Sequence, residues 1–146
     1  MTSPTILLVD DDVEFLGALE KMLRKRGYKV TATAWPTDAV QKIGEGKEHF
    51  DIVISDIRMP AISGFTFIRA LRESNPDIAV IVLSAFANSA VRESALNDGA
   101  IACLEKPVDM RLLFEAITRV TRKVDKPRAY GGKTKLNLIE GGCDRI

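Results

Sequence analysis

The segment DIVISDIRMP, residues 51–60, decides how the rest of the chain is arranged. Its apolar residues 52–54 run without interruption into Ser55 and Asp56, and Pro60 interrupts regular structure soon afterwards. A short, continuous apolar run is typical of a central strand in a parallel sheet, which is covered on both faces. The segment therefore predicts a buried strand whose carboxyl end carries Asp56 to the edge of a sheet.

Similar strands recur along the chain and alternate with segments of helical period. We expect strands over 6–9, 28–33, 52–54, 78–83 and 101–104, and helices over 13–26, 36–43, 64–74, 88–97 and 109–120. This alternation predicts a doubly wound α/β fold, a parallel sheet with right-handed crossovers and helices on both faces. The first, third and fourth strands are the most apolar and belong in the middle, so the predicted strand order is 2-1-3-4-5.

Apolar residues at helical spacing predict which side of each helix is buried. The fourth helix has the thinnest apolar face, so we expect that it can shift at low cost. The residues expected to be buried are Val13, Leu16, Leu19 and Leu23 in the first helix, Ala90, Val91, Ala95 and Leu96 in the fourth, and Leu112, Leu113, Ala116, Ile117 and Val120 in the last.

Length and composition predict one compact domain. Of the 146 residues, 46% are hydrophobic and 28% charged, and the formal net charge is +1. This balance favours neither nucleic acid nor an anionic membrane as a partner, and no apolar run is long enough to span a membrane. Two cysteines make no disulfide framework, so we expect a cytoplasmic protein. The predicted domain covers 1–123, and the Gly- and Pro-broken residues 124–146 are expected to be a polar tail or linker stub.

Charged and hydroxyl side chains follow four of the five predicted strands. Asp10 and Asp11 come after the first strand, Asp56 ends the third, Ser84 ends the fourth and Lys106 follows the fifth. In a doubly wound sheet ligands bind beyond the carboxyl ends of the strands, where the strand order reverses. We therefore expect these five side chains to lie on one rim.

Three carboxylates on one rim predict a cation. Two unit charges about 4 Å apart in a partly shielded cleft repel by roughly 4 kcal/mol, and oxygen ligands in an open site suit Mg²⁺. Asp56 can then attack a phosphoryl group and form an acyl phosphate. Lys106 can neutralise the phosphoryl oxygens as a point charge, and the Ser84 hydroxyl can donate a hydrogen bond to one of them.

Each residue taken alone has a simpler interpretation. The acidic triplet 10–12 suits a helix N-cap, and Asp56 suits a turn before Pro60. Ser84 alone suggests a satisfied hydroxyl at a strand end, and Lys106 alone suggests a solvated loop lysine. The functional interpretation rests on their convergence at one rim.

Four motifs together resemble the receiver domain of two-component response regulators. They are ILLVDDD at 6–12, SDIRMPAISGF at 55–65, LSA at 83–85 and LEKP at 104–107, and the resemblance covers about residues 4–122. It implies the flavodoxin-like five-stranded fold, which agrees with the predicted strand order.

The resemblance also implies roles for individual residues. Asp56 accepts a phosphoryl group from a histidine of a sensor kinase or a phosphotransfer protein, and Ser84 and Lys106 bind that group. Mg²⁺ is held by Asp10, Asp11, Asp56 and the backbone carbonyl of Arg58. A receiver domain catalyses its own phosphorylation and slow dephosphorylation, without turnover of an external substrate.

Phosphorylation in that family changes a face that binds a downstream partner or an attached output domain, and homodimerisation on phosphorylation is possible on the same grounds. The family has an aromatic residue three positions before the lysine, whereas this chain has Cys103. We therefore expect coupling to run through the fourth helix and its loop. We expect no direct contact of this domain with nucleic acid or membrane.

Three other interpretations stay open at this stage. Asp10 and Asp12 resemble the D-x-D of a haloacid-dehalogenase-type phosphatase, in which Asp10 would be the nucleophile. A flavodoxin-type flavin module shares the fold, although DDDVEF at 10–15 would repel a phosphate. A degenerate receiver would serve only as a binding face.

Overall fold

The five strands and five helices alternate along the whole described chain. The computed structural model describes residues 4–46, 49–56, 64–85 and 88–124. The order is β1 (Thr5–Val9), α1 (Val13–Lys25), β2 (Lys29–Thr33), α2 (Pro36–Glu45), β3 (Ile52–Asp56), α3 (Gly64–Ser74), β4 (Ala79–Ser84), α4 (Ser89–Asn97), β5 (Ala102–Glu105) and α5 (Met110–Val124). Every strand pair is parallel and the sheet order is β2-β1-β3-β4-β5, which confirms the predicted doubly wound fold and strand order.

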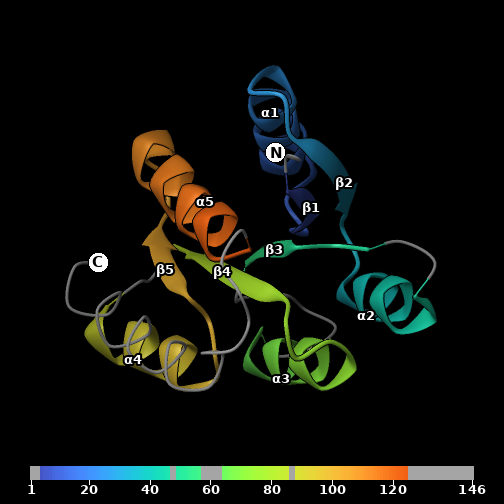
Figure 1. Ribbon diagram of the computed structural model, residues 1–146. Helices are drawn as coiled ribbons and strands as arrows, with labels where there is room; N and C mark the ends of the chain where they lie inside the picture. Colours follow the sequence, from blue (N-terminus) through green and yellow to red (C-terminus); the bar gives the residue numbers. More distant parts are fainter. Residues whose placement is uncertain (1–3, 47–48, 57–63, 86–87, 125–146) are drawn as a thin grey trace.

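The helices form two layers, with α1 and α5 on one face of the sheet and α2, α3 and α4 on the other (Figure 1). Alternate residues of each strand point to opposite faces, so the sheet separates two hydrophobic clusters. Leu7 and Val53 belong to the cluster under α2, α3 and α4, whereas Ile6 and Ile54 belong to the cluster under α1 and α5. The sheet is therefore covered on both faces, as its apolar central strands require.

The register brings the carboxyl ends of the central strands level with one another. Val9 of β1 lies opposite Ser55 of β3, and Asp56 lies opposite Leu83 of β4. These pairings extend β3 to Asp56, two residues beyond the predicted strand, because both neighbouring strands offer partners for its backbone. The carboxyl ends of β1, β3 and β4 consequently lie at the same edge.

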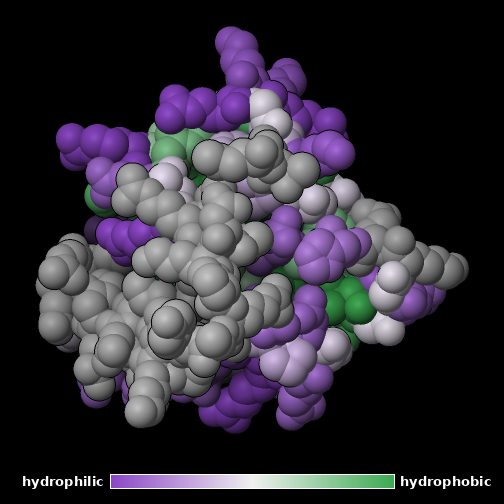
Figure 2. Space-filling view, in the orientation of Figure 1, coloured by the Kyte–Doolittle hydropathy of each residue, from purple (hydrophilic) through white to green (hydrophobic). Residues whose placement is uncertain are grey.

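The predicted helix faces are correct in the middle of the helices and wrong at three positions. Val13 is 68% exposed and Leu112 is 42% exposed, and Ala90 is also exposed. Val13 and Ala90 lie in the first turns of α1 and α4, and Leu112 lies to one side of the stripe formed by Leu113, Ala116, Ile117 and Val120. The space-filling view shows mostly hydrophilic side chains over α1 (Figure 2).

Some predictions fall on residues outside this description. They include Arg58 and nearly all of the predicted tail, from 125 to 146. Among the described residues, no helix combines the length and the apolar character that crossing a membrane requires.

Candidate functional site

Three charged side chains reach the carboxyl edge of the sheet from the same face. Strand alternation sets this arrangement, because a residue two positions after a buried one points to the same side. Asp10, Asp56 and Lys106 each stand two positions after a strand residue in the α1–α5 cluster; the preceding residues are Leu8, Ile54 and Leu104. The sheet therefore directs one ammonium and two carboxylates into the space beside the start of α1.

Lys106 links the two carboxylates. Its Nζ donates to Oδ2 of Asp10 at 2.7 Å and to Oδ2 of Asp56 at 2.8 Å. The side chains of Lys106, Asp10 and Asp56 are 17%, 4% and 12% exposed, so water screens these ion pairs weakly. Charge-assisted hydrogen bonds of this length are among the stronger ones in proteins, and they fix the lysine stem across the edge of the sheet.

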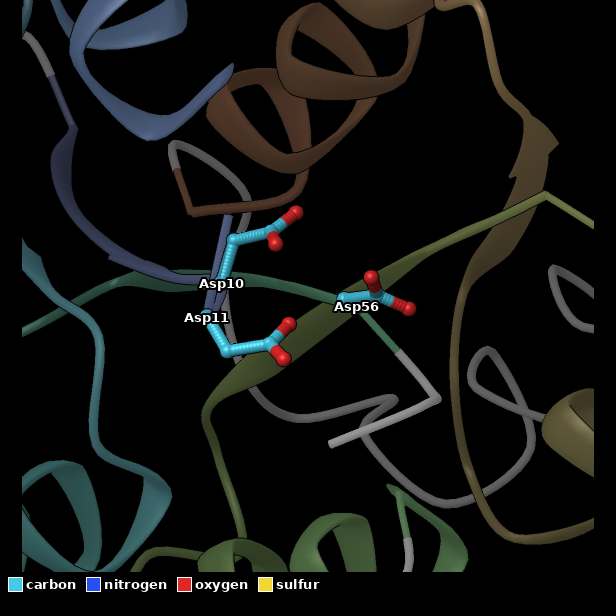
Figure 3. Close-up of side chains that lie close together, drawn as sticks. All are labelled: Asp10, Asp11 and Asp56. Carbon is cyan, nitrogen blue, oxygen red and sulfur yellow. The ribbon is translucent and has the colours of Figure 1, made fainter. Parts of the chain in front are cut away.

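Asp11 completes an acidic cluster with Asp10 and Asp56. One carboxylate oxygen from each residue lies within 4.8 Å of the others, and Asp11 is the exposed member. Asp10 and Asp11 come from the end of β1 and Asp56 from the end of β3, at the point where the strand order reverses (Figure 3). Three converging carboxylate oxygens, one of them open to solvent, fit a hard divalent cation such as Mg²⁺.

The electrostatics of the cluster follow from burial and from the shared lysine. Burial raises the pKa of Asp10 above its ordinary value, and the hydrogen bonds from Lys106 and from the Asp12 amide only partly offset that effect. For Lys106 burial alone would lower the pKa, but the hydrogen bonds to Asp10 and Asp56 outweigh burial and raise it. The ammonium is therefore firmly charged, whereas ionised Asp10 is held at a cost in free energy.

Ser84 lies at the end of β4, in the same row of strand ends. Ser84 is buried, and its backbone carbonyl accepts a hydrogen bond from the Lys106 amide at 2.8 Å. Ser84 stands two positions after Val82, which belongs to the cluster on the α2–α4 face. Ser84 thus approaches the site from the face opposite to Lys106, and its main chain fixes where the Lys106 residue leaves the sheet.

Asp12 lies outside the acidic cluster and caps α1. Its Oδ1 accepts a hydrogen bond from the Phe15 amide at 3.1 Å, and its own amide donates to Oδ1 of Asp10 at 2.9 Å. The N-cap interpretation of the acidic triplet is therefore correct for Asp12. Asp10 has hydrogen bonds to both of its carboxylate oxygens, from Asp12 and from Lys106.

Sequence reasoning missed Phe15, which contacts the site through its ring. The Lys106 Nζ lies over this ring, 4.3 Å from its centroid. A signal was present in the sequence, because a helix that begins directly after the acidic triplet must place its first turn beside the rim. An aromatic residue in that turn is a candidate neighbour for any lysine on the same edge.

Cys103 occupies a buried position in β5, opposite Val82 of β4. Burial raises the pKa of its thiol above the ordinary value, so the side chain behaves as a small core residue. It packs in the cluster that also contains Ala95 of α4. The place where the resemblance leads one to expect an aromatic ring is thus filled by a small side chain in the core under α4.

The fold and the site together define a class of protein. It is the class of flavodoxin-like domains, in which a doubly wound five-stranded sheet has an acidic cluster and a lysine at its carboxyl edge, at the switch point. Residues 6–118 match the response regulator receiver domain family, and the chain belongs to that family. It is thus a receiver domain of the two-component type. This membership argues against the phosphatase and the flavin module that the sequence alone left open.

Individual relatives agree with the family. The chain is 36% identical over 120 residues to the transcriptional regulatory protein PrrA of Mycobacterium tuberculosis, an alignment covering 82% of this chain and 49% of PrrA. It is 36% identical over 144 residues to the two-component response regulator ARR11 of Arabidopsis thaliana, covering 97% of this chain and 26% of that protein. A CheY-like receiver domain from Methanospirillum hungatei superimposes with a TM-score of 0.78 at 28% identity, covering 86% of this chain and 100% of that structure. The chain therefore spans about half or less of the length of these two curated relatives.

Proposed function

We propose that Asp56 accepts a phosphoryl group from a phosphorylated histidine of a sensor kinase or phosphotransfer protein. The observation that carries this proposal is the contact of Asp56 with the Lys106 ammonium at 2.8 Å, inside a cluster of three carboxylates. A nucleophilic oxygen, a fixed positive charge and a cation-binding set of ligands thus stand within a few ångströms of one another. Phosphoryl transfer needs mainly such positioning and charge.

The transfer forms one bond and breaks one bond. A carboxylate oxygen of Asp56 attacks phosphorus, the phosphorus–nitrogen bond of the donor breaks, and the imidazole nitrogen leaves with the electron pair. The Lys106 ammonium, which contacts Asp56, neutralises the charge on the phosphoryl oxygens. Ser84 donates its hydroxyl hydrogen to another of these oxygens. The attacking group is a carboxylate oxygen, so the bond to phosphorus forms without the release of a proton.

Asp10, Asp11 and Asp56 would hold Mg²⁺, which suits their oxygen ligands. When bound, this ion supplies positive charge to the phosphoryl oxygens during transfer. The backbone carbonyl of Arg58 is the fourth ligand that we propose, and it lies outside the described residues.

The signal leaves through the face formed by α4, β5 and α5. Within α4 only Ala95 and Leu96 are buried, so a shift of this helix disturbs little packing. Cys103 lies in the same cluster as Ala95, and its side chain has no aromatic ring that could rotate. Phosphorylation therefore acts through α4 and the loop before it, and the partner is a downstream protein or an output domain of a longer chain. Homodimerisation on phosphorylation would use this face.

The remaining proposals concern the borders and the location of the domain. We place the receiver domain at 1–123 and a tail or linker at 124–146, which agrees with a family match that ends at residue 118. The protein acts in the cytoplasm, where histidine kinases present their phosphorylated domains. It catalyses only its own phosphorylation and dephosphorylation.

The test uses a small phosphodonor, acetyl phosphate, with MgCl₂ and mass spectrometry of the intact chain. Wild type should gain one phosphoryl group, Asp56→Asn should gain none, and the matched control Asp12→Asn should behave as wild type. Borohydride trapping then locates the acyl phosphate. A label on Asp10 would support a phosphatase, and no label on wild type would support a degenerate receiver.

A further inference from the structure

One contact in the site joins an aromatic ring to the lysine. Phe15, in the first turn of α1, is half-buried, and its ring lies under the Lys106 ammonium at 4.3 Å from Nζ to the centroid. We propose that Phe15 is a positioning residue for phosphoryl transfer. Its ring holds the Lys106 ammonium in place while Asp56, the carboxylate partner of Lys106, is phosphorylated. This inference rests on the proposed function of Asp56.

Phe15 is fixed in position by contacts with residues of the site itself. Oδ1 of Asp10 accepts from the Asp12 amide at 2.9 Å, and Oδ1 of Asp12 accepts from the Phe15 amide at 3.1 Å. The Phe15 ring meets Lys106 Nζ, and Nζ returns to Oδ2 of Asp10 at 2.7 Å. Four contacts thus close a circuit through the start of α1, so the ring is fixed relative to the acidic cluster.

The lysine needs such a partner because its other contacts alter during the reaction. Lys106 has a flexible four-carbon stem and a compact charge that can follow any nearby oxygen. When an oxygen of Asp56 bonds to phosphorus, that carboxylate loses its negative charge and its hold on the ammonium weakens. The face of the Phe15 ring attracts the cation throughout, since its quadrupole does not depend on the phosphorylation state.

A merely structural role for Phe15 makes a different prediction. If the ring only fills space between α1 and the lysine stem, leucine would replace it well and the identity of the ring would not matter. If the ring face holds the cation, tyrosine would replace it and leucine would not. Phe114 offers a matched control, because a different cation, the Arg26 guanidinium, lies over its ring at 4.0 Å, and its ring is paired with that of Tyr28.

The experiment follows the rate of acyl phosphate formation from acetyl phosphate at saturating MgCl₂, over a range of donor concentrations. We expect Phe15→Leu to lower the saturating rate constant about fivefold and to leave the half-saturating donor concentration unchanged. Phe15→Tyr and the control Phe114→Leu should stay within about twofold of wild type on the same scale. A Phe15→Leu rate equal to wild type, or a Phe15→Tyr rate as low as that of Phe15→Leu, would overturn the proposal.

A double-mutant cycle shows whether the effect passes through the lysine. In a Lys106→Met background, Phe15→Leu should change the slow residual rate by less than about twofold. A further fivefold loss in that background would overturn the proposal, because the ring would then act without the ammonium. Failure of wild type itself to form an acyl phosphate on Asp56 would instead overturn the proposed function.

Proton NMR of the wild-type chain gives a second test, which does not require any variant to fold. Protons held over an aromatic face resonate upfield, so the ε-methylene protons of Lys106 should be shifted upfield from those of the exposed Lys25. Identical shifts for the two lysines would overturn the proposal.

Discussion

The ammonium of Lys106 lies 2.7 Å from Oδ2 of Asp10, a carboxylate that also faces the charge of Asp56. Two carboxylates thus share one ammonium, and Asp11 adds a third negative charge at the solvent side. Within the part of the chain that the structure describes, one ammonium thus faces a cluster of three carboxylates. Lys106 contributes to stability, the carboxylates favour a cation, and each of these consequences can be measured separately.

Replacement of Lys106 by methionine should destabilise the fold. Lys106→Met keeps the length of the stem but leaves Asp10 and Asp56 close together without their shared partner. Loss of a mostly buried charged hydrogen-bond partner costs about 2 kcal/mol in the free energy of unfolding. Urea denaturation measures this loss. The control Lys25→Met, at an exposed position in α1, should stay within about 0.5 kcal/mol of wild type, and an equal loss in both variants would contradict the role of the ion pairs.

The stabilisation by Lys106 should disappear at alkaline pH. The hydrogen bonds to Asp10 and Asp56 raise the pKa of Lys106 in the folded chain, so the unfolded chain releases this proton first as pH rises. The stabilisation is complete below the ordinary lysine pKa and is lost as pH rises through the folded pKa. The difference in unfolding free energy between wild type and Lys106→Met should therefore shrink above about pH 10. Denaturation at a series of pH values tests this, and a difference that grows with pH would contradict it.

The position of this ion pair was largely predictable from sequence. Carboxyl ends of parallel strands share one edge, so residues at or just beyond these ends, such as Asp10, Asp56 and Lys106, have to meet there. The structure brings these three together with Asp11, and it places Ser84 in the adjacent strand end. Their chemical roles remain predictions for the experiments above.

Contacts between layers were not predictable in the same way. Helical period identifies the middle of a buried stripe, but it does not show where a helix runs past the sheet, which is why Val13 and Ala90 are exposed. The contact of Phe15 with Lys106 depends on how α1 leans over the edge of the sheet. The start of α1 directly after the acidic triplet marks Phe15 as a candidate neighbour of the rim, but the angle of the helix, which decides the contact, is set by the packing of whole side chains.

Magnesium should stabilise the folded chain through Asp11. A ligand that binds only the folded state raises stability with concentration, by about 2.7 kcal/mol at a hundred times its dissociation constant. Asp11 is exposed, so Asp11→Asn should leave the metal-free melting temperature nearly unchanged while removing most of the rise caused by MgCl₂. Asp12→Asn is the matched control, because asparagine keeps the helix cap and Asp12 lies outside the cluster. Thermal melts across a MgCl₂ titration decide the matter, and equal responses of the two variants would contradict the assignment.

The turn between α4 and β5 is held against α3 by two arginines. Arg69 pairs with Asp98 at 3.1 Å, and Arg72 donates to the carbonyls of Ile78 and Gly99 at 3.0 and 3.5 Å. The carboxyl end of α4 is therefore tied to α3. At the opposite end of α4, Ala90 is exposed.

Gly99 is the residue on which this attachment depends. Its φ is +106°, and a Cβ there would lie 2.6 Å from Cδ of Arg72, so Gly99→Ala should strain the backbone and displace the arginine from its two carbonyls. We expect a loss of about 2 kcal/mol in the free energy of unfolding. Gly17→Ala in α1 is the control, because a Cβ there meets nothing within 4 Å and alanine should stabilise the helix by about 0.5 kcal/mol. Urea denaturation compares the two, and hydrogen exchange of α4 shows whether its carboxyl end becomes less protected. Normal protection of α4 in a destabilised Gly99→Ala chain would contradict the attachment.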